Sequence, residues 1–209
     1  MRNKNVLRNR NKLIHGVGVN DADYQVSELI GGVRCICPIY AKWSEMLRRC
    51  YSVKHQAKHP TYKGCEVVKE WHVFSEFRAW MLTQDHEGKE LDKDILVPWN
   101  KVYGPDRCLL VAPPINRLLE DSRATRGEYP IGVSFYKRRG KFMSKGRLDN
   151  RTAFFGYFDS PEGAHRAYCR AKSMHVMSVA IRQTDARVRS ALVRWSEIIG
   201  TGEAYADRK

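Results

Sequence analysis

Acidic and amide side chains concentrate in one stretch of this 209-residue chain, residues 91–116. Asp92, Lys93 and Asp94 follow one another directly, and Asn116 closes the stretch. Two short apolar runs enclose these polar residues, and several prolines and a glycine lie between them. Polar groups gathered between runs that should be buried indicate a functional site, not a core.

The elements that would position this site follow the order strand, loop, strand, helix. Residues 90–96 form a short predicted strand that Pro98 ends, and a turn-rich loop follows. Residues 108–111 are a continuous apolar run with the length of a buried strand. A pair of prolines then opens a helix whose first turn carries Asn116, since proline suits the first helical positions.

This order and its residues resemble the ββα-metal nucleases, also called HNH or His-Me finger nucleases, and in particular the homing endonucleases of phages. The resemblance rests on Leu91-Asp92-Lys93-Asp94, on Asn100-Lys-x-Tyr-Gly-Pro-x-x-Cys108, and on Val111-x-x-x-x-Asn116. In that family an acid ending the first strand and an Asn or His on the helix hold one divalent metal against the scissile phosphate. The resemblance implies that Asp92 and Asn116 hold Mg²⁺ or Mn²⁺, with Asp94, Asn100 and Arg107 supporting the motif.

Lys93 departs from the family pattern, because it stands where these nucleases carry the histidine that activates water. A general base needs a pKa near the working pH, and that of lysine starts at about 10.4. Burial or nearby cations could depress the pKa of Lys93, but Asp92 and Asp94 would raise it. A metal-bound hydroxide or His86 could replace the base, and Lys93 could bind phosphate. The alternative interpretation is a decayed nuclease fold that is retained for binding.

The composition is strongly basic: 37 Lys and Arg stand against 23 Asp and Glu, which gives a formal charge of +14 and a pI near 9.7. Such a balance favours a polyanionic partner, most often nucleic acid. No apolar run approaches the roughly twenty residues that span a bilayer, and the basic N-terminus does not resemble a secretory signal. We therefore expect a cytoplasmic protein, in the host cell if a phage encodes it, with no membrane partner. The six cysteines lack C-x-x-C pairs, so we expect reduced thiols and no structural zinc.

Between the basic N-terminus and the site, the sequence predicts two helices separated by a loop. The first helix begins at Pro38 and has one buried face. Residues 52–64 are predicted as a loop in which His55 and His59 would share a face only if the segment were helical. Residues 69–84 form the strongest helix, and its wide aromatic stripe should be core.

After the site, residues 129–136, 141–145 and 152–158 are predicted as three short strands, followed by a helix that Ser160 and Pro161 open. This βββα order resembles the DNA-binding domain of plant ethylene-response factors (ERF), which accompanies HNH domains in many phage endonucleases. The matching segments are Gly132-Val133, Lys141-Phe142, Phe155-Gly-x-Phe158-Asp-Ser-Pro-Glu162, Ala164, Ala167-Tyr168 and Ala171-Lys172. In that family the exposed face of the sheet lies in the major groove of DNA.

Basic residues concentrate on this predicted sheet, and Asp149 is the only acid between Tyr136 and Arg151. Alternation along the strands would direct a subset of them to one face. We expect that face to contact double-stranded DNA, and a merely solvated hairpin is the alternative. Phe142 replaces the tryptophan of the family, which leaves stacking open. The predicted DNA-contacting residues are Ser134, Tyr136, Lys137, Arg138, Arg139, Lys141, Phe142, Lys145, Arg147 and Arg151.

Asp185 is the predicted N-cap of a last helix with an unbroken apolar face. This face could cover either module, or the same helix in a second copy, as in a homodimer.

We expect an α+β protein with five parts: a basic arm and turns at 1–32, an HNH-like module at 33–122, a linker at 123–126, an ERF-like module at 127–182, and the last helix and tail at 183–209. The favoured function is a phage-type DNA endonuclease, with homing as a role that the resemblance implies. The alternatives are a decayed HNH-fold DNA-binding protein, either regulator or architectural factor, and thirdly RNA or ribosome binding.

Overall fold

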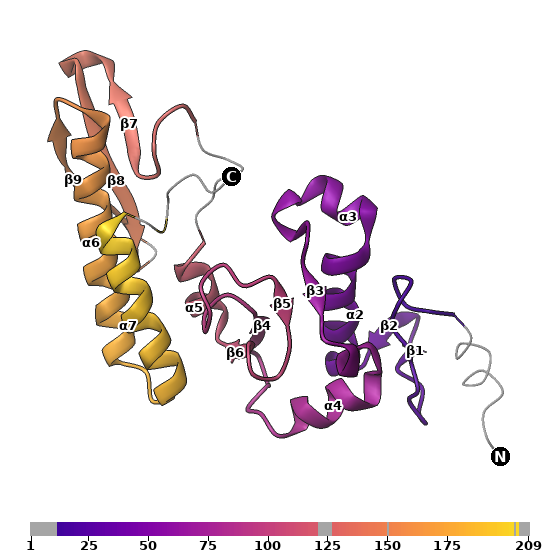
Figure 1. Ribbon diagram of the computed structural model, residues 1–209. Helices are drawn as coiled ribbons and strands as arrows, with labels where there is room; N and C mark the ends of the chain where they lie inside the picture. Colours follow the sequence, from indigo (N-terminus) through magenta and orange to yellow (C-terminus); the bar gives the residue numbers. More distant parts are fainter. Residues whose placement is uncertain (1–11, 121–126, 150, 203, 205–209) are drawn as a thin grey trace. The chain divides into compact units, whose positions relative to one another are not determined.

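The chain forms two compact units, residues 1–113 and residues 114–209. The computed structural model describes residues 12–120, 127–149, 151–202 and 204, and Figure 1 labels its elements. Helices and small sheets occur in both units, so the expected α+β class is confirmed. The division falls between Pro113 and Pro114, ahead of the predicted linker at 123–126, which lies outside the described residues together with most of the predicted basic arm.

The first unit opens with a hairpin and a helix. β1 (Ser27–Ile30) pairs antiparallel with β2 (Val33–Ile36), so part of the region predicted as turns is a regular hairpin. α2 (Pro38–Tyr51) begins at the proline, as the sequence predicted, because proline needs no amide partner in the first turn. Its buried face carries Trp43, among other apolar residues.

The segment predicted as a loop over residues 52–64 is a short helix followed by a 3₁₀ turn. α3 (Val53–Lys58) begins after Ser52, whose hydroxyl accepts a hydrogen bond from the backbone amide of His55 at 3.3 Å. η1 (Pro60–Tyr62) completes the segment. The prediction failed because a serine cap, which favours a helix start, lay among residues whose composition favours a loop.

The helix predicted over residues 69–84 is divided in two. β3 (Glu66–Val67) leads into a 3₁₀ turn, η2 (Lys69–His72), and α4 (Phe74–Leu82) follows. Val73 separates the two because the backbone on either side of it is hydrogen-bonded to Val19. The amide of Val19 donates to the carbonyl of His72, and the carbonyl of Val19 accepts from the amide of Phe74. Hydrogen bonds to a distant segment therefore replace helical ones at this point.

The aromatic stripe predicted as core is buried. Trp71 and Phe77 lie edge to face with ring centroids 5.1 Å apart, and Trp43 of α2 packs against Phe74 at 5.4 Å. The indole nitrogen of Trp43 donates a 2.7 Å hydrogen bond to the carbonyl of Trp71, which pairs the one polar atom of that ring. These contacts hold α2 and α4 together under the site.

Three short strands carry the stretch that the sequence singled out. β4 (Glu90–Asp92) pairs antiparallel with β6 (Leu109–Val111), and β5 (Val102–Tyr103) pairs parallel with β3. α5 (Pro113–Leu118) begins two residues after β6. The two predicted strands and the helix after them are therefore confirmed, but β4 ends at Asp92 and not at residue 96, and the segment predicted as a loop contains β5.

The second unit contains a three-stranded antiparallel sheet of order β7–β8–β9. The strands are β7 (Val133–Tyr136), β8 (Lys141–Leu148) and β9 (Arg151–Phe158), and a 3₁₀ turn, η4 (Lys137–Arg139), joins the first two. The register between β8 and β9 shifts at a bulge between Ser144 and Lys145. The predicted three strands are confirmed, each with shifted ends.

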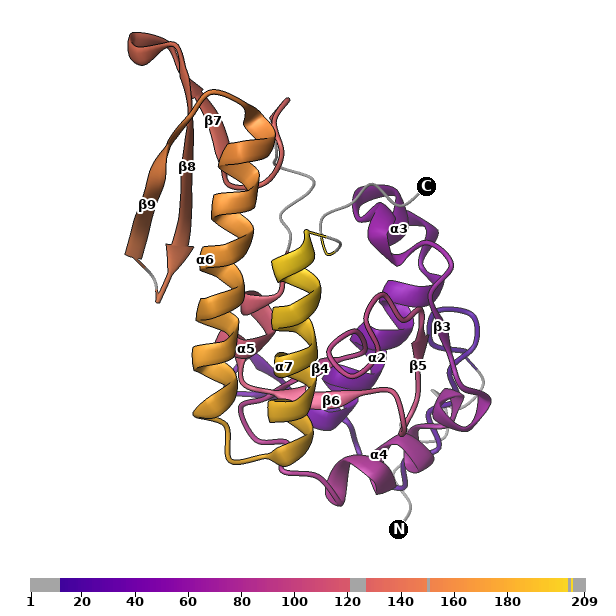
Figure 2. The ribbon, with the colours of Figure 1, turned by 60° about the vertical axis from the view of Figure 1, so that its left-hand side comes forward.

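A long helix covers one face of this sheet, as Figures 1 and 2 show. α6 (Pro161–Ile181) starts after Ser160, whose hydroxyl accepts a hydrogen bond from the amide of Gly163 at 3.1 Å. Tyr168 packs so closely on the sheet that a Cβ at Gly132 would lie 2.1 Å from its ring, and one at Gly146 2.9 Å. Glycine is therefore needed at both positions for α6 to approach the sheet.

The last helix, α7 (Ala186–Thr201), packs against α6. Asp185 caps it, as predicted, by accepting hydrogen bonds from the amides of Arg187 and Val188. The Ser173 hydroxyl of α6 donates a 2.7 Å hydrogen bond to the carbonyl of Ser196. The sequence left open what covers the apolar face of α7, and in the structure α6 of the second module covers it. A homodimer through this helix stays an untested alternative.

All six cysteines lie among the described residues, and each is a free thiol. Burial raises the pKa of Cys50 and of Cys108 to about 12 each, so these two thiols are protonated at neutral pH. Within the described ranges, no helix combines the length and the apolar character that crossing a membrane requires.

Candidate functional site

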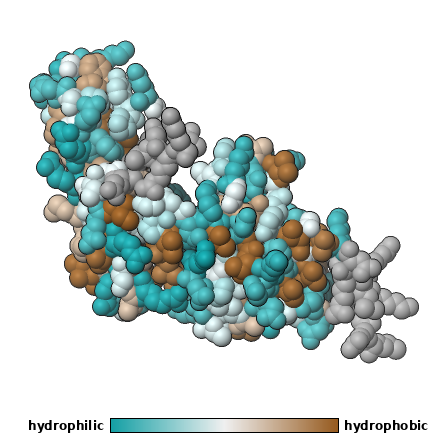
Figure 3. All heavy atoms as spheres, in the orientation of Figure 1, coloured by the Kyte–Doolittle hydropathy of each residue, from teal (hydrophilic) through white to brown (hydrophobic). Residues whose placement is uncertain are grey.

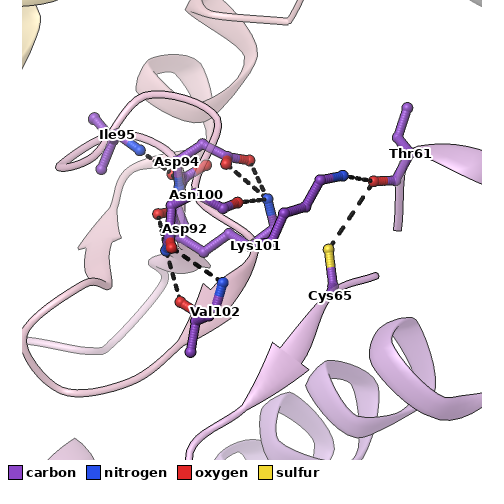
Figure 4. A network of polar contacts seen from close by, with 9 residues as sticks. Thr61, Cys65, Asp92, Asp94, Ile95, Asn100, Lys101 and Val102 are labelled. Atoms are coloured by element: carbon purple, nitrogen blue, oxygen red, sulfur yellow. Dashed lines mark hydrogen bonds and ion pairs between the residues drawn. The ribbon is translucent and has the colours of Figure 1, made fainter. Parts of the chain in front are cut away.

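Asp92 ends β4 and closes the turn that follows it. Its Oδ1 accepts hydrogen bonds from the backbone amides of Asp94 at 2.7 Å and Ile95 at 2.6 Å (Figure 4). A carboxylate that binds the amides two and three residues later is the usual device for starting a turn. This explains why the strand stops at Asp92, and it leaves Oδ2 without a hydrogen bond to any described residue.

Lys93 is buried, with 7% of its surface exposed, and all the hydrogen-bond donors of its ammonium group have acceptors. Nζ donates to both carboxylate oxygens of Asp94, at 2.7 and 2.6 Å, and to the carbonyl of Asn100 at 2.7 Å. A lysine ammonium has three N–H donors, so these three acceptors use all of them. In this geometry Lys93 is a structural cation, placed neither to accept a proton nor to reach a phosphate.

Asn100 stabilises the other end of the loop between β4 and β5 through side-chain hydrogen bonds. Its Nδ2 donates to the carbonyls of Lys93 at 2.9 Å and Val102 at 2.6 Å, and its Oδ1 accepts the amide of Val102 at 3.0 Å. Only 8% of the residue is exposed. Figure 4 shows how these bonds, together with those of Asp92, draw the loop between β4 and β5 into one network.

The state of Asp92 decides what this loop could do. Burial raises the pKa of Asp92, while the two backbone hydrogen bonds and the Lys93 cation lower it. One oxygen is held by the turn and the other accepts no hydrogen bond from the part of the chain that the structure describes, so the carboxylate could serve as one ligand of a divalent cation. Among the described residues no group of three or more His, Cys, Asp or Glu side chains gathers in a form that could hold a metal.

The hydrogen bonds just described do not include the remaining residues predicted for this site. Asn116 is on α5 and belongs to the second unit, so its pairing with Asp92 stays a prediction. Arg107 is exposed in the turn before β6, where its backbone amide donates to Gly104. The structure thus brings together Asp92, Lys93, Asp94 and Asn100.

The second candidate surface is the face of the β7–β9 sheet that α6 does not cover, which we call the outer face. Ser144 is fully buried and Gly146 lies against Tyr168, so these positions point to α6. The intervening residues Lys145 and Arg147 are exposed on the opposite face. Cross-strand pairing adds Phe154 opposite Lys145, and Tyr157 opposite Met143. In Figure 3, hydrophilic residues cover most of the surface at the β7–β9 end of this unit.

An aromatic row runs across the outer face. The ring of Tyr157 lies 5.5 Å from that of Tyr136 and 4.9 Å from that of Phe154. The guanidinium of Arg139 stacks over Tyr157 at 4.6 Å. Phe154 is 56% exposed, which is unusual for a phenylalanine in a sheet that has a covered side. The face therefore combines exposed cations with accessible rings.

Four of the remaining residues predicted to contact DNA differ in placement and accessibility. Phe142 pairs with Phe135 and Phe158 and points to the α6 side, so it is not available to stack on the outer face. Lys141 forms an exposed 2.5 Å ion pair with Asp159. The Ser134 hydroxyl oxygen is covered and has no hydrogen-bond partner among the described residues. Arg151 begins β9 at the end of the sheet.

The other predicted contacts lie in exposed positions. Lys137, Arg138 and Arg139 form the η4 turn, and none of them is buried. The prediction omitted Phe154 and Tyr157. The alternation of β9 could have suggested them, but the bulge at Phe155 within β9 shifts which of its aromatic residues face outward.

Comparison with known proteins adds no relative: no family model, curated protein or solved structure matches this chain.

Proposed function

We propose that this protein binds double-stranded DNA through the outer face of the β7–β9 sheet. The observation that supports it is the exposure of Lys145 and Arg147 beside the aromatic row, with no ion pair to either cation among the described residues. The net charge of +14 favours the same class of partner.

The two kinds of side chain on the outer face suit two parts of a duplex. The cations would neutralise phosphates and release counterions, which supplies affinity without reading sequence. An exposed ring such as Phe154 could contact the methyl group of thymine in the major groove, which is wide enough to admit a small β-sheet element. The Arg139–Tyr157 stack would hold both groups in place before binding.

Fluorescence anisotropy with a labelled duplex tests this proposal. The variant Lys145→Gln with Arg147→Gln should bind more weakly, and the slope of log Kobs against log salt should become shallower by roughly 2, since each phosphate contact contributes about 0.9. The matched control is Arg166→Gln with Arg170→Gln, which removes two exposed cations from α6. Equal losses in the two variants would show that binding depends on net charge alone and would overturn the proposal.

A second candidate function is metal-dependent DNA cleavage by the first unit. It is favoured by the order β4, β6, α5 and by the placement of Asp92 at the end of the first of these strands, with one oxygen unbonded. Asp92 fits a ligand of Mg²⁺ or Mn²⁺, and Asn116 is the second ligand that the family resemblance implies. A bound divalent cation would activate water and stabilise charge on the phosphate. Lys93 would keep the loop in shape, and a base other than Lys93 would be required.

Nicking of a supercoiled plasmid with Mg²⁺ or Mn²⁺ tests this second function. Cleavage that requires metal and is lost in both Asp92→Asn and Asn116→Ala would support it. Asp85→Asn is the matched control, because Asp85 is an exposed acid of the same unit that forms an ion pair with Lys89. If the wild type binds the plasmid and leaves it intact with either metal, the protein is a DNA-binding protein without this activity. Competition with structured RNA separates the RNA-binding alternative.

A further inference from the structure

A second strongly basic surface lies on the first unit, around α3. The twenty residues from Met46 to Cys65 contain five Lys and Arg, two His and no acid. Arg48 and Arg49 within this stretch are bonded to Glu45, at 2.7 and 3.1 Å. The other three cations are exposed, and no described residue forms an ion pair or hydrogen bond with their side-chain ammonium groups: Lys54, Lys58 and Lys63. We call these three lysines the α3 basic surface.

The geometry of α3 keeps these charges together. Lys54 and Lys58 are four residues apart on one helix, so they lie on the same face. The Gln56 side chain donates to the carbonyl of Cys50 at 2.5 Å, which ties α3 to the end of α2. The rings of His55 and His59 lie 4.5 Å apart, and the ring of His55 lies 5.6 Å from that of Tyr62. The surface is therefore held in one shape by side chains other than its lysines.

Packing does not account for this charge. None of the residues of α3 is buried, so the helix adds no side chain to the core. Burial, and then the nearby Arg48 and His59, lower the pKa of His55, so this histidine is neutral at pH 7. The three lysines carry positive charge at neutral pH, and no ion pair within the described part of the chain offsets it.

We propose that the α3 basic surface is a second contact for the phosphate backbone of DNA. The proposal rests on the proposed DNA binding and extends it to a surface of the first unit. Lysine is suited to this role, because its ammonium contacts phosphate as a point charge without a fixed orientation. Two cationic surfaces on one chain would make the second contact intramolecular, which raises the overall affinity beyond that of either alone.

The test compares two double variants of the whole protein in the same salt titration with duplex DNA. Lys54→Gln with Lys58→Gln removes two charges of the surface and keeps good helix formers. Arg34→Gln with Lys69→Gln removes two exposed cations of the same unit that lie outside the surface. The first variant should lower the slope of log Kobs against log salt by roughly 2, at about 0.9 per lost phosphate contact, while the control retains the wild-type slope.

Two results would overturn the inference, and they are distinguishable. If the wild type binds DNA and both double variants have the same slope, the α3 basic surface makes no contact although the proposed function stands. If the wild type binds no duplex at all, the proposed function fails and the inference fails with it. Circular dichroism of the Lys54→Gln, Lys58→Gln protein checks that its helices are intact.

Discussion

Replacing Lys93 by methionine should destabilise the first unit, because this lysine is a structural cation. The change removes three hydrogen bonds, two to Asp94 and one to the carbonyl of Asn100. A buried ion pair that loses one partner costs about 3–5 kcal/mol, but the side chain of Asp94 is 42% exposed, so water can solvate it in part. The carbonyl left unpaired adds about 1 kcal/mol. We therefore expect a loss of roughly 2–3 kcal/mol in the free energy of unfolding.

Urea denaturation followed by tryptophan fluorescence measures this loss. Four of the five tryptophans belong to the first unit, so the signal reports mainly on it: Trp43, Trp71, Trp80 and Trp99. With a slope of about 2 kcal/mol per molar urea, the midpoint should fall by roughly 1 M. Lys101→Met is the control, since Lys101 is exposed and its ammonium group donates to the carbonyl of Thr61, so the loss in this variant should stay at about 0.5 kcal/mol. An unchanged midpoint in Lys93→Met would refute the structural role. If the same variant also lost nicking activity, Lys93 would instead take part in DNA cleavage.

Two further predictions concern other groups. Asp92→Asn should leave the urea midpoint unchanged or raised, because the amide Oδ1 can still accept the hydrogen bonds from Asp94 and Ile95 and no buried charge remains. Asp92→Ala removes the acceptor and should lower the free energy of unfolding by about 1–2 kcal/mol. Similar losses in the two variants would contradict the role of Asp92 in the turn. Burial lowers the pKa of His175, and the smaller opposing effect of Asp149 raises it. As the pH falls through about 6.5, the unfolded state therefore takes up a proton that the folded state does not, and the stability of the folded state falls. Hydrogen exchange of the α6 amides should accordingly speed up between pH 7 and pH 5.5 after correction for the intrinsic rate, and less so in His175→Gln; an equal pH dependence in both proteins would exclude His175 as the cause.

Local signals predicted much of the fold. Pro38, Ser160 with Pro161, and Asp185 mark helix starts through capping and proline geometry, which act within a few residues. The three strands of the second unit follow from alternation and turn residues. Such features need no knowledge of distant contacts.

The errors arose where distant contacts decide the structure. The helix is interrupted at Val73 because the backbone groups of its neighbours His72 and Phe74 are hydrogen-bonded to Val19, far away in sequence. The role of Lys93 depends on the carbonyl of Asn100, which only the folded loop brings within 2.7 Å. Phe142 was expected on the DNA-facing side, and only the register of β8 with its neighbours assigns it to the α6 side.

DNA binding through the outer face is tested most directly by an NMR titration with duplex DNA that follows each backbone amide of the protein. We expect shifts that saturate together at Lys145, Arg147, Phe154 and Tyr157 on the outer face, with little change at the exposed Arg166 and Arg170 of α6. Shifts confined to α6 and α7, or no saturable change anywhere in the β7–β9 sheet, would contradict it.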